Sequence, residues 1–136
     1  MPTIEDMQAV LEKDPATRAS GIEIVGAHAD GIELTLTVSP EHGNSVGVCH
    51  GGVVFTLADA ASGLLANSAP GENWVTIDSQ IRYTAPARQG DELLARCDRR
   101  WSTRSDFARF ETKVFVGDSL IAIVDATMKQ IGRREG

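Results

Sequence analysis

The segment 51–67 is apolar on nearly every side, and this feature constrains the fold of the chain more than any other. It runs Gly-Gly-Val-Val-Phe-Thr-Leu-Ala-Asp-Ala-Ala-Ser-Gly-Leu-Leu-Ala-Asn and has the length of an ordinary helix. A helix that is apolar all round is normally buried, because water would otherwise face its hydrophobic side chains. The rest of the chain must therefore fold around this helix.

Most of the remaining chain reads as antiparallel strands. Residues 32–38 alternate between apolar and polar side chains after the turn pair Asp30-Gly31, and this pattern predicts a hairpin over 22–38. A short helix is expected over 3–14, ending or kinking at Asp14-Pro15. Further strands are expected over 74–83, 91–101, 106–116 and 120–131.

This layout of helix, hairpin, long apolar helix and a run of strands favours the α+β class over a parallel α/β sheet. About six strands beside one apolar helix must curve around it. We therefore predict the hotdog fold, a curved antiparallel sheet wrapped around a central helix. The chain is expected to form a single domain over 1–136, with its N-terminal helix within 1–15.

Composition argues against several classes of function. The 136 residues carry a net charge of −6, which disfavours a general surface for nucleic acid or anionic membranes. The start of the chain lacks signal-peptide features, and no apolar run has the length of a membrane span. Cys49 and Cys97 are too few for a disulfide framework. We therefore expect a reducing, cytoplasmic compartment, with no metal site and no cofactor.

Gly51 and Gly52 stand at the start of the predicted helix. The first N–H groups of a helix have no helical acceptor, and the helix dipole adds partial positive charge there. Glycine also lets a ligand approach the backbone closely. The pair can hold an anion or a developing oxyanion, although a plain glycine turn before a helix explains the same spacing.

Asp59 is the clearest anomaly, because it interrupts the middle of the apolar helix. Aspartate is unfavourable inside a helix and costly to bury. It must have a polar partner or line a cavity. One interpretation is a structural carboxylate with local hydrogen bonds, and the other is a base or nucleophile in a partly desolvated site.

Two familiar catalytic patterns fail here. Residues 43–47 match G-x-S-x-G, but the nucleophile elbow requires a histidine after the triad acid, and the last histidine is His50. Cys49 and His50, even with His42, lack a third metal ligand at suitable spacing. Adjacent cysteine and histidine side chains also make a poor catalytic pair. We favour an orienting role for His50 and a packed thiol for Cys49.

Several arginines crowd the second half of this acidic chain. Guanidinium groups suit the phosphates of a nucleotide-like ligand, although a solvated strand surface explains the same residues. The predicted phosphate-binding residues are Arg82, Arg100 and Arg104, in a cluster that also includes Arg88, Arg96 and Arg99.

Taken together, these residues resemble the hotdog acyl-CoA thioesterases of the phenylacetate-degradation type. The resemblance covers about residues 16–132. The core of that signature stands here as Asn44, Gly47, His50-Gly51-Gly52 and Leu57-Ala58-Asp59. The strand Val75–Asp78, the strand end Arg82-Tyr83 with Pro86, and Gly90-Asp91 follow in matching order.

The resemblance implies hydrolysis of an acyl-CoA, plausibly aryl or arylacetyl, by a homodimer that pairs into a homotetramer. The Gly51 N–H, with Gly52 beside it, would polarise the thioester carbonyl. Asp59 would attack that carbonyl or activate water. Asn44 would hold substrate or water, and Thr76 would hydrogen-bond the carboxylate or the water.

The spacing of Gly51 and Asp59 adds an argument from geometry. Eight residues of one helix separate their backbones by about 12 Å, whereas reacting groups must lie about 3–3.5 Å apart. If both residues act on one carbonyl, Gly51 comes from one chain and Asp59 from another. The spacing therefore predicts an active site shared between subunits.

Two other functions are compatible with these residues. A hotdog dehydratase would act on hydroxyacyl thioesters, and a non-catalytic module would bind or sense acyl-CoA without turnover. Release of free thiol from a panel of acyl-CoAs separates the three. The sequence leaves open the acyl group and the choice between nucleophile and general base for Asp59.

Overall fold

One antiparallel sheet with helices on one side makes up the computed structural model, which describes residues 3–28, 30–103 and 106–133. The helices are α1 (Ile4–Leu11), α2 (Pro15–Ala19) and α3 (Gly51–Asn67), with a short 3-10 helix, η1, at Pro40–His42. The strands are β1 (Glu23–His28), β2 (Gly31–Thr37), β3 (Glu72–Tyr83), β4 (Glu92–Ser102), β5 (Phe107–Val116) and β6 (Ser119–Arg133).

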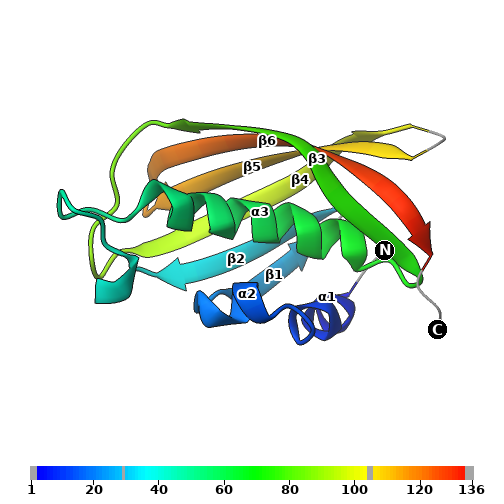
Figure 1. Ribbon diagram of the computed structural model, residues 1–136, viewed down its shortest axis with the longest axis horizontal. Coiled ribbons are helices and arrows are strands. Elements are labelled where there is room, and N and C mark those ends of the chain that lie inside the picture. Colours follow the sequence, from blue (N-terminus) through cyan, green and yellow to red (C-terminus); the bar gives the residue numbers. More distant parts are fainter. Residues whose placement is uncertain (1–2, 29, 104–105, 134–136) are drawn as a thin grey trace.

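The order of the strands explains why a helix lies at the centre. The sheet runs β1-β2-β4-β5-β6-β3, and all neighbouring strands are antiparallel. Because β2 lies near one edge and β3 forms the other, the chain between them must cross the face of the sheet. α3 makes this crossing, with α1 and α2 beside it on the same side (Figure 1). The prediction of a hotdog fold is confirmed.

α3 packs one side of its surface on the sheet. Leu57 and Ala61 are fully buried and belong to the same core as Leu34, Leu93 and Phe110 from the strands. The opposite side is not enclosed by the chain itself, so the prediction of a surrounded helix holds for one side only. We call that side the open stripe; its residues are half-buried or exposed, and they are Gly52, Thr56, Asp59 and Gly63.

The expected helix over 3–14 is α1, which ends at Leu11, and a second helix that was not predicted, α2, begins at Pro15. Asp14 caps α2 by accepting the N–H of Thr17 at 3.1 Å and its hydroxyl at 2.7 Å. Pro15 occupies the first helical position, where its missing N–H costs nothing. The proline that was expected to end or kink one helix therefore starts the next.

The strands lie within two residues of their predicted bounds at every end. The predicted hairpin is β1–β2, and β5 and β6 form another. None of the helices in the described ranges is long and apolar enough to cross a membrane.

Replacing Leu57 by Ala tests whether α3 supplies the core. The side chain is fully buried, so we expect Leu57→Ala to lower the free energy of unfolding by about 2–5 kcal/mol. Val46, which is 77% exposed, provides the control. Val46→Ala should change the free energy of unfolding by less than about 0.5 kcal/mol. Urea unfolding, monitored by circular dichroism, measures the free energy of unfolding of both variants. Similar losses of stability in the two variants would contradict this account of the core.

Candidate active site

The first turn of α3 leaves one backbone donor free. His50 is the N-cap residue, and its Nδ1 accepts the N–H of Gly52 at 2.9 Å. Val53 and Val54 donate their N–H groups to the carbonyl of His50 at 2.9 and 3.3 Å. Among the residues described, no acceptor is found for the N–H of Gly51. Gly51 therefore presents a free donor at the positive end of the helix.

This arrangement corrects the role expected of Gly52 and supports the role expected of His50. Gly52 was expected to bind substrate, but its N–H is occupied by the His50 ring. Since Nδ1 accepts that bond, the ring carries its proton on Nε2 and is neutral while the bond lasts. His50 thus holds the start of the helix in place, as an orienting residue would.

Tyr83, at the end of β3, closes over Gly51. Its hydroxyl donates to the carbonyl of Gly51 at 2.7 Å, and burial raises the pKa of Tyr83. A Cβ atom added at Gly51 would lie 3.0 Å from that hydroxyl oxygen, so a larger residue there would have to displace the ring. Sequence reasoning noted Tyr83 only as part of a strand end, because its contact with Gly51 joins residues far apart in the chain.

Asn44 builds the loop that leads into α3. Its side-chain oxygen accepts the N–H groups of Val46 and Val48, each at 3.1 Å. Its own N–H donates to the carbonyl of Val48 at 2.9 Å. The side-chain nitrogen of Asn44 has no acceptor within the described ranges, so it remains available as a donor.

Asp59 and Thr76 meet on the open stripe. The hydroxyl of Thr76, on β3, donates to Oδ1 of Asp59 at 3.4 Å. One side of the Asp59 carboxyl is exposed to solvent, yet partial burial against its neighbours desolvates it and raises its pKa. The hydrogen bond from Thr76 lowers that pKa, and the negative charge of Asp14 raises it further. The pairing of carboxylate and hydroxyl predicted from the sequence is thus present within one chain.

The predicted site residues of one chain form two separate groups. Asn44, His50 and Gly51 gather at the start of α3, and Asp59 and Thr76 lie two turns along it. α3 is continuous from Gly51 to Asn67, so the backbones of Gly51 and Asp59 are about 12 Å apart. A single carbonyl group cannot contact both groups of one chain.

The two cysteines are buried free thiols. Burial raises the pKa of both, and that of Cys97 reaches about 12. Neither is a thiolate at neutral pH, so the packed-thiol interpretation of Cys49 fits the structure. No group of three His, Cys, Asp or Glu that could hold a metal ion occurs in the part of the chain that the structure describes.

The predicted arginine cluster is not formed. Arg96 pairs with Glu33 at 3.1 Å, and Arg99 pairs with Asp30 at 3.3 Å. These guanidinium groups join β4 to β2 and to the turn before it. Arg96 is exposed on the sheet surface, whereas the Arg99 side chain is only 20% exposed and lies over the rings of Trp74 and Phe110.

The arginines expected to bind phosphate do not share one position. Arg82 lies on β3 and Arg100 on β4, with β5 and β6 between them. Strands are spaced about 4.8 Å apart, so about 14 Å of sheet separates the two. Arg104 lies outside the described residues. Closeness in sequence gave a false impression of a cluster, because successive strands of a sheet need not be neighbours in space.

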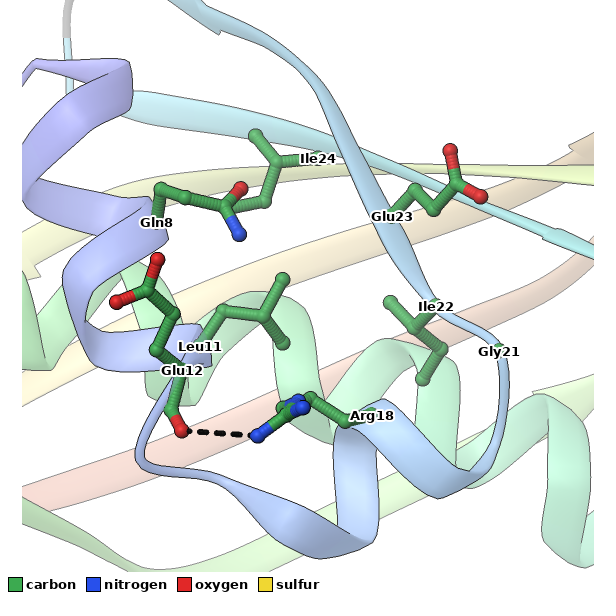
Figure 2. Close-up of a pocket in the computed structure, with 8 residues that line it drawn as sticks. All are labelled: Gln8, Leu11, Glu12, Arg18, Gly21, Ile22, Glu23 and Ile24. Carbon is green, nitrogen blue, oxygen red and sulfur yellow. Dashed lines mark hydrogen bonds between the residues drawn. The ribbon is translucent and has the colours of Figure 1, made fainter.

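One hollow of the described surface lies away from both groups of site residues. It measures about 850 Å³ and lies between α1, α2 and β1 (Figure 2). Leu11 and Ile22 are buried beneath it, and Arg18 donates to the carbonyl of Glu12 at 3.2 Å along one side (Figure 2). None of the predicted site residues lines it.

Comparison with known proteins gives a family match that includes His50, Gly51, Asp59 and Thr76. The sequence profile of the Thioesterase superfamily matches residues 46–105. The acyl-coenzyme A thioesterase PaaI of Escherichia coli is 33% identical over 91 residues, which cover 67% of this chain and 64% of that protein. The chain spans between 40% and 64% of the length of the curated relatives that it matches.

Similarity to solved structures extends over most of the chain. The structure of E. coli PaaI, from the phenylacetic acid degradation operon, has a TM-score of 0.88 at 26% identity and covers 95% of this chain and 93% of that one. The smu.793 protein of Streptococcus mutans, bound to acetyl CoA, has a TM-score of 0.77 at 29% identity, covering 84% and 91%.

The fold is that of the hotdog proteins, and residues 46–105 match the Thioesterase superfamily. Over most of its length, the chain is similar to the PaaI-like hotdog thioesterases.

Direct titration of Asp59 tests the electrostatics of this site. Partial burial and the charge of Asp14 raise the pKa of Asp59, so its carboxyl should become protonated at a higher pH than a free aspartate, whose pKa is about 3.9. Asp14→Asn keeps the cap of α2 but removes the charge, and it should lower the pKa of Asp59. Carbon-detected NMR titration measures the pKa of Asp59 in the wild type and in Asp14→Asn, with Asp118→Asn as the control. If Asp14→Asn leaves the pKa of Asp59 unchanged, the influence of Asp14 is contradicted.

Proposed function

We propose that the protein is an acyl-CoA thioesterase that hydrolyses an acyl-CoA to a free acid and CoA. The observation that carries this proposal is the free N–H of Gly51 at the start of α3, on the same helix that presents Asp59 on its open stripe. An oxyanion donor and a carboxylate are the two groups that hydrolysis of a thioester requires. Relatives that are named acyl-CoA thioesterases or that hold acetyl CoA support it.

In the proposed reaction, the Gly51 N–H donates to the thioester oxygen and stabilises the negative charge that develops there. The side-chain nitrogen of Asn44 is a second donor for substrate or water. Asp59 either attacks the carbonyl carbon or takes a proton from the attacking water, and Thr76 holds the carboxylate or that water. The bond from carbon to sulfur breaks, and the thiol of CoA leaves with a proton while water supplies the hydroxyl of the acid.

The proposed active site is shared between two subunits, because one chain cannot bring Gly51 and Asp59 to the same carbonyl. β3 is an edge strand of the sheet, and Val75 and Ile77 beside Thr76 are 40% and 53% exposed. An edge strand with exposed apolar side chains invites pairing with another chain. A homodimer that covers β3 and the open stripe, and that pairs into a homotetramer, is the assembly we propose.

The proposed substrate is an aryl- or arylacetyl-CoA, and the proposed setting is phenylacetate degradation in the cytoplasm. This rests on the similarity to E. coli PaaI, whose structure is described as coming from the phenylacetic acid degradation operon. A dehydratase is less well supported, because the Nδ1 atom of His50 is engaged by the Gly52 N–H. An acyl-CoA binding module would retain CoA affinity and release no thiol.

Asp59→Asn should lower kcat about 100-fold or more and leave the affinity for substrate largely intact, since loss of a catalytic base or nucleophile has an effect of this size. Thiol release from a panel of aryl and alkyl acyl-CoAs measures the rate. Asp118→Asn, an exposed carboxylate in the turn between β5 and β6, is the matched control and should keep its activity. If Asp59→Asn retains more than about a third of the wild-type kcat, Asp59 does not have this role.

Mixing two inactive variants tests the shared site. Asn44→Asp keeps the oxygen that holds the loop and removes the side-chain donor, and Asp59→Asn removes the carboxylate. In a mixed dimer one site carries both changes and the other carries neither. Random association makes about half of the dimers mixed, so roughly a quarter of all sites become wild type under two-fold symmetry.

Refolding the two variants together should therefore restore up to about a quarter of the wild-type rate. Each variant refolded alone is the control. A site built within one chain would keep one change in every site and restore nothing. The shared site is falsified if native mass spectrometry confirms mixed dimers and no thiol is released.

A further inference from the structure

The peptide group between Gly51 and Gly52 is held by side chains at both of its ends. Its carbonyl accepts the hydroxyl of Tyr83 at 2.7 Å, and its N–H donates to Nδ1 of His50 at 2.9 Å. The preceding peptide group, between His50 and Gly51, carries the free N–H on which the proposed reaction depends. Two side chains therefore fix the peptide group next to the proposed oxyanion donor.

Two successive glycines make this turn of α3 easy to deform. Glycine has no Cβ and adopts more backbone conformations than other residues, so it loses more entropy when a helix fixes it. Rotation at Gly51 changes the angle between the two peptide groups, and with it the direction of the free N–H. A group in a catalytic site must be held to within about 0.5 Å and 10–20° of its productive geometry. The glycine pair therefore needs a restraint from outside the helix.

Tyr83 provides this restraint from a firmly held part of the sheet. It is the last residue of β3 and pairs with Ala122 of β6. The next residue, Thr84, donates its N–H to the carbonyl of Ile121 at 2.8 Å and its hydroxyl to the carbonyl of Leu120 at 2.6 Å. The backbone at Tyr83 is thus bound to β6, and the hydroxyl reaches the start of α3 from a fixed position.

The ring of Tyr83 also lies close against Gly51. A Cβ atom added at Gly51 would lie 3.0 Å from Oη, 3.1 Å from Cζ and 3.4 Å from Cε1 of the ring. The glycine that makes the turn deformable therefore also gives the tyrosine access to the helix. The hydrogen bonds from Tyr83 and to His50 strengthen each other, because both polarise the same peptide group.

We infer that Tyr83 is a positioning residue, which holds the peptide group between Gly51 and Gly52 so that the N–H of Gly51 stays directed at the thioester oxygen. The inference rests on the proposed function. Tyr83 has one hydroxyl proton, and that proton is engaged by the Gly51 carbonyl. Tyr83 therefore acts through Gly51 and donates no hydrogen bond to the substrate.

Tyr83→Phe keeps the ring and removes the hydrogen bond. We expect kcat to fall about tenfold, an effect of the size expected for one lost hydrogen bond. KM should stay within about twofold, because the donor acts mainly on the charge that develops in the transition state. Thr84→Val removes the neighbouring hydroxyl and is the matched control, which should keep kcat within about twofold. An unchanged kcat in Tyr83→Phe, or a raised KM with an unchanged kcat, would overturn the inference.

A double variant separates positioning from packing or direct catalysis. The hydroxyl of Tyr83 and the ring of His50 hold the same peptide group, so removing either already frees it. The loss of kcat on combining Tyr83→Phe with His50→Ala should therefore be clearly smaller than the product of the two separate losses. A loss equal to that product would mean two independent roles and would overturn the inference.

Circular dichroism checks that each variant folds, and thiol release from one acyl-CoA measures kcat and KM throughout. If Tyr83→Phe does not fold, Tyr83→Leu, which also lacks the hydroxyl, replaces it in both experiments. A wild-type protein that releases no thiol would contradict the proposed function. An active wild type whose kcat is unaffected by loss of the hydroxyl would contradict only the role of Tyr83.

Discussion

The connection from β2 to β3 has to cross the entire sheet, and the burial of α3 along that crossing is the constraint on which the rest of the structure depends. Leu57, Leu64 and Leu65 are buried almost completely on the sheet side, and each contributes roughly 1.5–3 kcal/mol by leaving water. This burial keeps the helix fixed relative to the strands. The start of α3 and its middle are thereby held at a constant separation, which a flexible loop could not maintain.

The same packing determines where a carboxylate is tolerated. On the sheet side of α3, a charge would lie among apolar side chains without water. On the open stripe, Asp59 reaches Thr76 and solvent in the single chain. A second chain over this stripe would remove more of that water, and electrostatic interactions strengthen as water is excluded. In the proposed dimer, assembly and catalysis therefore use one surface, and a subunit alone has only parts of a site.

The sequence predicted most where local pattern and tertiary structure agree. The bounds expected for α3 are those observed, because its apolar run ends at both sides in residues that stop helices. Strands were found by their alternation and turns. The end of α1 before Pro15 was predicted and α2 was not, since proline serves equally as the end of one helix and the first residue of another. The capping of α2 by Asp14 depends on side-chain geometry, which the spacing of residues in the sequence does not reveal.

The site was predictable in its residue types and less so in its contacts. The hydrogen bond between Thr76 and Asp59 was implied by the family resemblance, and it is present in the structure. The arginine cluster failed, because it requires the order of strands in the sheet. Tyr83 was missed and Gly52 was misjudged for a common reason, since both depend on which backbone groups at the start of α3 are already hydrogen-bonded. That information resides in the folded chain.

A histidine cap on α3 suits the charge that develops in the proposed reaction. Aspartate is among the most favourable N-cap residues, but its negative charge would lie beside the Gly51 N–H and repel a developing oxyanion. The Nδ1 atom of His50 accepts the Gly52 N–H as a carboxylate would, and the neutral ring leaves the positive end of the helix uncompensated. The cap therefore accepts the N–H of Gly52 without cancelling the positive electrostatic field at the N–H of Gly51. In the proposed reaction, that remaining field acts on the thioester oxygen.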